Sequence, residues 1–228
     1  MPMRPRALDR DLYVLDHPLR VGGLELGART SLIRLADGGL FVHSPGPFGG
    51  GVRAEIEKLG PVRALVAPNL LHHRFLAENA AAFPEARVFG APGVAAKQPA
   101  VRFAATLGDS APALWAGQLE QHLLRGVPSI EEVLFFHPRS RTLLLTDAAF
   151  HVRTSDHFFT RLFMRANGGY GRFGPTRIFR YRVLRDRVAL RASLERVLGW
   201  DFERVIVTHG EVLETGGHEA FRKAFAWV

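Results

Sequence analysis

Short apolar β-strand patterns recur along this chain of 228 residues, and their order relative to the helical patterns constrains the fold most. Strands come first, strands and helices then alternate, and the chain closes with strands, a helix, a strand and a helix. The strand patterns cover residues 12–15, 31–35, 40–43, 61–67, 87–90, 133–137, 141–146 and 204–208. Because each sheet and each helix must bury an apolar face, this order predicts two mixed β-sheets packed together with helices outside.

Besides a short helix with Val52, Ile56 and Leu59 on one face, three helical patterns follow from the spacing of apolar residues. One covers about residues 186–198, with Asp186 as its N-cap, a leucine and valine stripe, and Gly199 as its end. The C-terminal helix places Phe221 and Phe225 on its inner face. The pattern over residues 72–83 puts an apolar stripe against the sheet, and Pro84 closes it.

The length suits one domain, residues 1–228, with an insertion at about 151–185. In the insertion, aromatic residues alternate with arginines and glycines break the pattern. Such a segment fits a stacking platform for single strands, a lid or a contact between copies of the chain. We expect it to close over the edge of the sandwich or to form a homo-oligomer contact.

Cysteine is absent from the sequence, which excludes disulfides, thiol nucleophiles and iron–sulfur clusters. Any metal site must therefore use His, Asp and Glu. The basic start of the chain leads into no apolar signal segment, and no run approaches the ~20 apolar residues that a membrane span needs. We expect a cytoplasmic protein of bacterial type, without membrane contact.

The formal net charge is +8, which by itself would suit a nucleic-acid partner. Only Lys58, Lys97 and Lys223 are lysines, however, and a GC-rich genome produces such an excess of arginine without selection for a partner. We expect no specific nucleic-acid binding, only weak and salt-sensitive association.

Polar side chains follow three of the predicted strands. His72 and His73 come after the strand that ends at Ala67, Asp147 follows the strand of residues 141–146, and His209 follows Thr208. Functional residues gather at strand ends, where loops leave the sheet. We expect His73, Asp147 and His209 to approach a common point.

The order of elements resembles the metallo-β-lactamase fold. Residues 41–45, 66–73 and 199–210 look like a bacterial branch of that fold known mainly as a domain of unknown function. The resemblance covers nearly the whole chain. It implies an αββα sandwich, of the α/β (α+β) class, with a metal site at one edge between the sheets.

The family's main metal motif, His-x-His-x-Asp-His, is eroded here. Asn69 and Leu71 stand at its first two histidines, His73 at its aspartate and Arg74 at its last histidine. A later family histidine aligns near residues 126–129, where this chain has none. Asn69 and Arg74 are therefore expected to contact a ligand or a neighbouring side chain rather than a metal.

Two family positions survive: Asp147 matches the metal-bridging aspartate and His209 the late histidine. His72 and His151 are further candidates for ligands, His151 because a helical segment would bring it to the side of Asp147. Alternatively, His72 is a buried, hydrogen-bonded histidine and Asp147 caps a turn. Arg74 cannot coordinate a cation, and it could instead pair with Asp147 in place of a metal.

Two functions follow from these residues. The first is a metallo-hydrolase with a reduced site for one zinc, iron or manganese ion, or none, acting on an ester, lactone, thioester or phosphoester, with Asp147 as ligand or base. The second is a non-catalytic descendant of the fold that binds a small ligand or a protein. Arg74 and the missing histidines favour the second, and Asp147 and His209 favour the first.

Overall fold

The computed structural model describes residues 3–228, so Met1 and Pro2 of the predicted domain lie outside the described residues. Its larger sheet has the order β1-β2-β5-β6-β7-β8-β9. The bounds are β1 (Arg6–Asp9), β2 (Leu12–His17), β5 (Ala28–Arg34), β6 (Leu40–His43), β7 (Val62–Ala67), β8 (Arg87–Gly90) and β9 (Phe103–Thr106). Pairing is antiparallel from β1 to β6 and parallel from β6 to β9, so the sheet is mixed.

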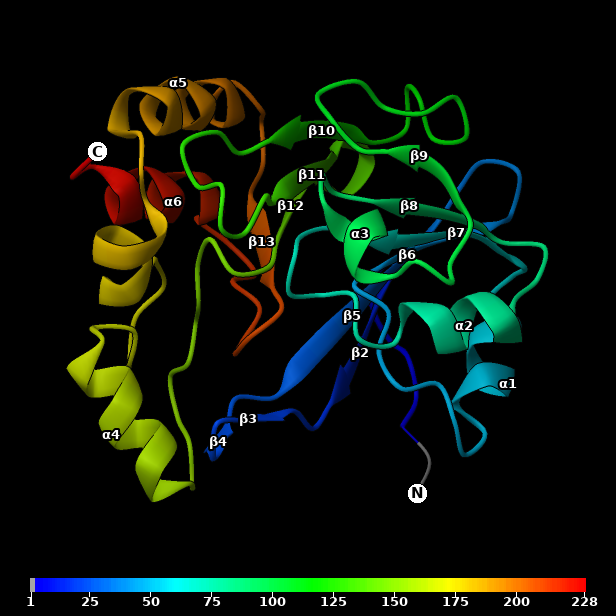
Figure 1. The fold of residues 1–228 in the computed structure, drawn as a ribbon, viewed down its shortest axis with the longest axis horizontal. Coiled ribbons are helices and arrows are strands. Elements are labelled where there is room, and N and C mark those ends of the chain that lie inside the picture. Colours follow the sequence, from blue (N-terminus) through cyan, green and yellow to red (C-terminus); the bar gives the residue numbers. More distant parts are fainter. Residues whose placement is uncertain (1–2) are drawn as a thin grey trace.

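The smaller sheet has the order β10-β11-β12-β13 and is mixed as well, because β12 and β13 are parallel and the other pairs antiparallel. Its strands are β10 (Glu120–Leu123), β11 (Val133–His137), β12 (Thr142–Leu145) and β13 (Arg204–Val207). A separate hairpin, β3 (Arg20–Val21) and β4 (Leu24–Glu25), extends from the connection between β2 and β5 (Figure 1).

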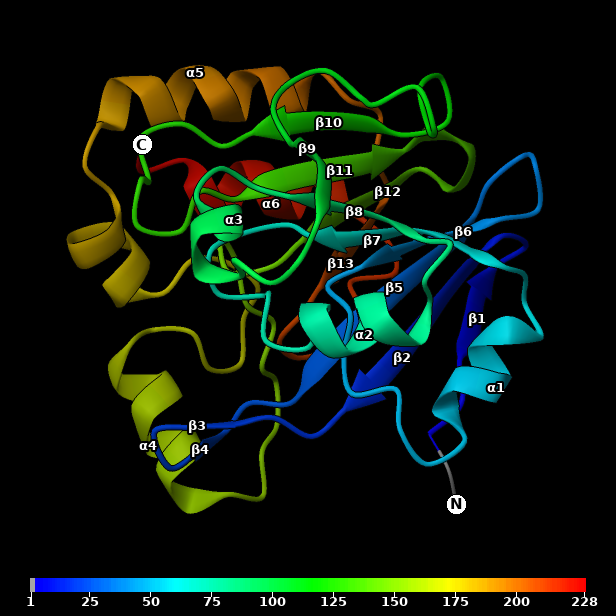
Figure 2. The same ribbon diagram turned by 45° about the vertical axis from the view of Figure 1, so that its right-hand side comes forward.

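Six α-helices accompany the two sheets in the described residues. They are α1 (Val52–Glu57), α2 (Leu76–Ala82), α3 (Val94–Lys97), α4 (Phe158–Ala166), α5 (Arg187–Leu198) and α6 (Gly217–Phe225), with a 3₁₀ turn at Pro138–Ser140 and a π-helical turn at Phe179–Val183. In Figures 1 and 2, α1, α2 and α3 lie on the side of the larger sheet and α5 and α6 on the side of the smaller one. The predicted αββα sandwich of two mixed sheets is confirmed.

The smaller sheet shows why the layers form, because its side chains alternate between two cores. Phe135 and Leu144 point into the core shared with the larger sheet. Their neighbours Leu134, Phe136 and Leu143 point the other way, into the core under α5 and α6. A sheet that is apolar on both faces must be covered on both faces, which fixes its place inside the sandwich.

Several predicted elements match in detail. The helix predicted over residues 186–198 is α5, where the Asp186 side chain accepts a hydrogen bond from the Ala189 backbone N–H. Gly199 ends the helix in a right-handed conformation, so its freedom to adopt positive φ is not used. Phe221 and Phe225 are buried on α6, as expected.

The helix predicted over residues 72–83 is shorter than expected. It begins at Leu76, and the preceding residues, His72 and His73 among them, form turns. The prediction is wrong there because the Asn69 side chain caps the backbone N–H groups of Leu71 and His72 and starts a turn instead of a helix. This difference decides which of the two histidines faces the sheets.

The strand directions bring the ends of five strands to one edge. β5 is antiparallel to both β2 and β6, and β7 is parallel to β6, so β2, β6 and β7 all run in the same direction. All three end at the edge where β5 begins. β12 and β13 end there from the other sheet, followed by Asp147 and His209. The hairpin β3-β4 and helix α4 project beyond this edge (Figure 1).

Among the helices of residues 3–228, none combines the length and the apolar character that crossing a membrane requires.

Candidate metal centre

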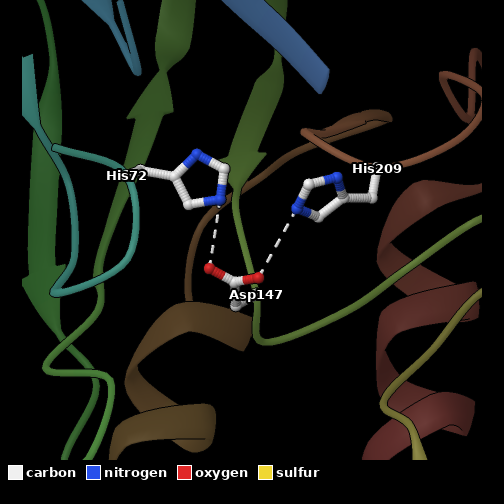
Figure 3. Close-up of side chains that lie close together, drawn as sticks. All are labelled: His72, Asp147 and His209. Carbon is white, nitrogen blue, oxygen red and sulfur yellow. Dashed lines mark ion pairs between the residues drawn. The ribbon is translucent and has the colours of Figure 1, made fainter. Parts of the chain in front are cut away.

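His72, Asp147 and His209 meet at the edge of the sandwich. Figure 3 shows the two imidazoles on either side of the Asp147 carboxylate. His72 Nε2 lies 3.1 Å from Asp147 Oδ2, and His209 Nε2 lies 3.6 Å from Asp147 Oδ1. One potential ligating atom from each residue falls within 4.8 Å of the others, close enough for the three side chains to hold one ion.

Asn69 places His72 and touches Asp147 at the same time. Its Oδ1 accepts the backbone N–H of His72 at 2.8 Å and so fixes the turn after β7. Its Nδ2 donates to Asp147 Oδ2 at 2.6 Å and to Thr146 Oγ1 at 2.9 Å. Asn69, predicted as a ligand-binding residue, therefore orients the aspartate in this structure.

The carboxylate of Glu132 holds the turn that carries Asp147 through its backbone N–H groups. Glu132 Oε1 accepts the backbone N–H of Thr146 at 2.7 Å, and Oε2 accepts those of Asp147 at 2.9 Å and Ala148 at 2.8 Å. Burial, together with the charge of Asp147, raises the pKa of Glu132 to about 7. Sequence reasoning missed Glu132, because an acidic residue before a strand ordinarily faces solvent.

Asp147 is ionised despite its burial. Burial acts to raise its pKa, but the charge of His72 and the hydrogen bonds from His209 and His72 outweigh that effect, so the pKa of Asp147 lies well below its usual range. A buried carboxylate of this kind requires a positive partner.

The hydrogen bonds of His209 define which of its nitrogens faces the site. His209 Nδ1 lies 2.7 Å from the carbonyl oxygen of Gly27, and a carbonyl only accepts, so Nδ1 carries a proton. His209 Nε2 faces Asp147 Oδ1 at 3.6 Å. When Nε2 is protonated it pairs with the carboxylate, and when it is deprotonated, as a metal ligand must be, the two acceptors can hold a cation between them.

His72 is held by Ser44, whose Oγ lies 2.8 Å from His72 Nδ1. Ser44 has a φ of 55°, in the left-handed region that non-glycine residues seldom adopt. Its carbonyl accepts the Thr30 hydroxyl at 2.8 Å, which helps to hold this conformation. Strained residues that present a side chain to a site are characteristic of functional centres.

The donor set fits one divalent ion. Two imidazoles and one carboxylate suit zinc, iron or manganese. Ligating histidines usually donate their other N–H to a carbonyl or a similar acceptor, as His209 does to Gly27, and ligating carboxylates are themselves hydrogen-bonded, as Asp147 is to Asn69.

The structure does not bring the other candidate ligands to this point. His73 turns away, and its Nδ1 accepts from Gln98 Nε2 at 2.8 Å. His151 lies in an extended segment rather than a helix, and its Nδ1 bonds the carbonyl of Glu211 at 3.0 Å. The expectation that His73 would join Asp147 and His209 is therefore corrected to His72, which belongs to the same turn.

Arg74 does not take the place of a metal. It is exposed, and its guanidinium lies over the Phe75 ring at 5.6 Å. Within residues 3–228, its contacts include no ion pair with Asp147, so the predicted Arg74–Asp147 pair is wrong. The side chain of Arg74 instead forms part of the cavity wall described next.

A cavity of about 450 Å³ opens directly onto His72, Asp147 and His209. The hairpin β3-β4 and its flanks form one wall, and the insertion forms another with Phe163, Met164 and Phe179. The insertion thus closes over the edge of the sandwich. His17, at the end of β2, lines the cavity too, and burial lowers its pKa. Its place at the end of a strand was the signal that could have found it.

The sequence matches one family model, "Domain of unknown function (DUF4336)", over residues 9–162, more than half of the chain. The chain belongs to the DUF4336 family. The matched range of this DUF4336 protein includes Asn69, His72, Glu132 and Asp147, whereas His209 lies beyond it. A search of curated proteins gave no match.

Solved structures similar to the DUF4336 chain have the metallo-β-lactamase fold. The DIM-1 metallo-β-lactamase exposed to ceftazidime matches with a TM-score of 0.66 at 14% identity, covering 99% of this chain and 97% of that one. A metallo-β-lactamase from Pontibacter korlensis gives 0.65 at 11% identity, with 99% of both chains covered. The metal-soaked Flv1 flavodiiron core from Synechocystis sp. PCC6803 gives 0.70 at 12% identity, and the match spans 99% of this chain but 60% of that longer one.

Proposed function

We propose that this protein is a metal-dependent hydrolase with a reduced site for one zinc, iron or manganese ion held by His72, Asp147 and His209. The observation that carries the proposal is the convergence of His72, Asp147 and His209, whose potential ligating atoms all lie within 4.8 Å of one another. The fold supports it, since the similar solved structures include metallo-β-lactamases. We infer that the DUF4336 family is a divergent branch of that fold.

The substrate bond would be that of an ester, lactone, thioester or phosphoester. A divalent ion held by the three side chains supplies Lewis acidity toward a carbonyl or phosphoryl oxygen and toward water. Asn69 and Glu132 keep the Asp147 carboxylate and its turn in place, and the cavity walls around it are largely apolar. Low local polarity strengthens every charge interaction at the site.

A site for two ions receives less support than a site for one. In the eroded motif, Asn69 donates a hydrogen bond to Asp147, Leu71 has no donor atom, and Arg74 is a permanent cation at the cavity wall. His73 is hydrogen-bonded to Gln98. The three residues that converge are enough for one ion with an open position.

The alternative is a non-catalytic module that binds a small ligand in the same cavity. One observation favours it: Asp147 already receives a hydrogen bond from Asn69, and a protonated His72 would complete the charge balance without a metal. In that case the three side chains would form a fixed polar floor of the cavity.

The test is stoichiometric metal binding by the purified protein. We expect one equivalent of zinc, iron or manganese by elemental analysis, and loss of that equivalent in His72→Ala, Asp147→Ala and His209→Ala. His73→Ala and His151→Ala serve as matched controls, because both remove a nearby imidazole outside the cluster, and they should retain the metal. A wild-type protein that binds none of these ions when they are supplied in excess overturns the proposal.

Location and partners follow the sequence expectations and stay proposals. A cytoplasmic location is compatible with the absence of cysteine, since no disulfide requires an oxidising compartment. Only weak, salt-sensitive nucleic-acid binding is expected, because the positive charge is spread over many arginines.

A further inference from the structure

The cavity above the metal centre has an apolar lining that the three ligating residues do not explain. Its walls carry Leu19, Leu24 and Leu26 from the hairpin segment and Phe163, Met164 and Phe179 from the insertion. Its volume of about 450 Å³ lies in the range of small-molecule sites, roughly 300–1,000 Å³. Polar groups gather at one end, at His72, Asp147 and His209.

The small number of charged side chains on the cavity walls favours a substrate with an apolar chain over a phosphoester. Within the described chain, Arg74 is the only arginine or lysine that lines this cavity. A phosphoester carries negative charge that proteins usually meet with several cations or backbone N–H groups. An apolar chain, in contrast, requires only the aliphatic and aromatic surface that the two walls provide.

We propose that the cavity holds the apolar acyl chain of a carboxylic ester or thioester, with the acyl carbonyl at the metal centre. This inference rests on the proposed function and narrows its substrate class. Hydrolysis adds water across the acyl C–O or C–S bond: the acyl carbon gains a hydroxyl, and the leaving oxygen or sulfur takes the proton. The products are a fatty acid and an alcohol or a thiol.

The first experiment measures binding without catalysis. The metal-free protein is loaded with the neutral apolar fluorophore N-phenyl-1-naphthylamine, which is then displaced by the neutral amides butanamide, hexanamide, octanamide and decanamide. Each added methylene that enters the cavity should strengthen displacement by about fourfold, until the cavity is full.

Leu24→Trp narrows the cavity from the hairpin wall, where Leu24 is half-buried, and should weaken octanamide displacement by at least about tenfold. Val188→Trp is the matched control, because Val188 is 81% exposed on α5 and does not line the cavity. Ile178→Asn provides a second variant of the wall at a side chain that is 41% exposed, so the protein should fold even if Leu24→Trp does not.

The second experiment compares p-nitrophenyl esters from acetate to decanoate with p-nitrophenyl phosphate, using the metal-loaded protein. We expect kcat/KM to rise with acyl length and to exceed that for the phosphate. Displacement that does not depend on chain length, or faster hydrolysis of the phosphate, overturns the acyl-chain inference and leaves the metal site untouched. Chain-length-dependent displacement by a protein that binds no metal overturns the proposed hydrolase and the hydrolytic step, and leaves an apolar ligand-binding module.

Discussion

At the scale of single residues, the site depends on side chains that hold the ligands rather than on the ligands alone. Glu132 accepts three consecutive backbone N–H groups, the second of them that of Asp147, and Asn69 joins the turn after β7 to the turn after β12. Two turns from different sheets are thus tied together by one amide and one carboxylate. Side chains that hydrogen-bond to metal ligands usually orient those ligands and strengthen metal binding.

Replacing Asn69 tests that link. Asn69→Ala removes the hydrogen bond to Asp147 Oδ2 and the cap on the His72 backbone N–H, so we expect zinc affinity to fall by about 10–100-fold in a competition titration with a chelator. Asn79→Ala is a matched control: Asn79 is equally buried, but its Nδ2 donates to the carbonyls of Gly46 and Phe75. Equal losses of zinc affinity in both variants would contradict a specific role for Asn69.

His43 gives a prediction for pH. Burial, with the charge of His72 as a smaller cause, lowers the pKa of His43 from 6.5 to about 3. The unfolded chain therefore binds more protons than the folded one between these values, so this contribution to stability is complete above pH 6.5 and is lost as the pH falls toward 3. His43→Phe removes it, and its ring can keep the edge contact with Phe135.

The measurement is the free energy of unfolding in urea at pH 6.5 and pH 4. Wild-type stability should fall by about 3 kcal/mol more than that of His43→Phe over this interval. The comparison between the two proteins cancels other titrating groups, Glu132 included. If the unfolding free energies of the wild type and His43→Phe differ by the same amount at pH 6.5 and at pH 4, the pKa of His43 is not lowered as described.

At the scale of elements, helix α4 is joined to the hairpin by one side chain. Thr160 on α4 is fully buried, and its Oγ1 accepts the backbone N–H of Glu25 on β4 at 2.8 Å. The two elements that form opposite cavity walls therefore meet at this hydrogen bond, at the end of the molecule away from the sheets (Figure 2).

Thr160→Val keeps the shape of the side chain and removes both this acceptor and the hydroxyl that donates to the Glu25 carbonyl at 3.3 Å. We expect a local cost of about 1 kcal/mol, seen as roughly fivefold faster hydrogen exchange at the Glu25 amide. Thr176→Val is the control: Thr176 also lies in the insertion, but its Oγ1 accepts from the backbone of Phe179 rather than from the hairpin. Unchanged exchange at Glu25 in Thr160→Val would show that packing alone joins the two walls.

The sequence predicts elements well where the apolar pattern is strong and poorly where pairing depends on distant residues. β11, β12 and α5 have long apolar patterns or clear caps, and each was predicted close to its observed bounds. β10 carries Gln121 and His122, both buried, so its sequence does not look like a strand. The hairpin β3-β4 has two residues in each strand, which is too short for any pattern.

The sequence predicted the edge of the candidate site and two of its residues, but not the third. Strand ends are readable from sequence, so Asp147 and His209 could be placed at one edge. The choice between His72 and His73 could not be made, because it depends on the turn that Asn69 caps and on the later start of α2 at Leu76. Adjacent residues in a turn point in different directions, and periodicity says nothing about which one faces inward.

At the scale of the whole molecule, the insertion has two faces with different surroundings. Its inner face lines the cavity with Phe163 and Met164, while Phe158 and Phe159 on α4 are 59% and 63% exposed. We propose that two copies of the chain contact each other through this outer face. That residues 1–228 form a single domain is likewise a prediction.

The two walls of the cavity belong to neither of the large sheets, and neither supplies a residue to the metal centre. One interrupts the connection between β2 and β5, and the other follows β12, so each can lengthen, shorten or change its side chains without altering the strands beneath. Under the proposed function, the fold thus separates the residues of the chemistry from those of selectivity, because either wall can change while His72, Asp147 and His209 stay in place.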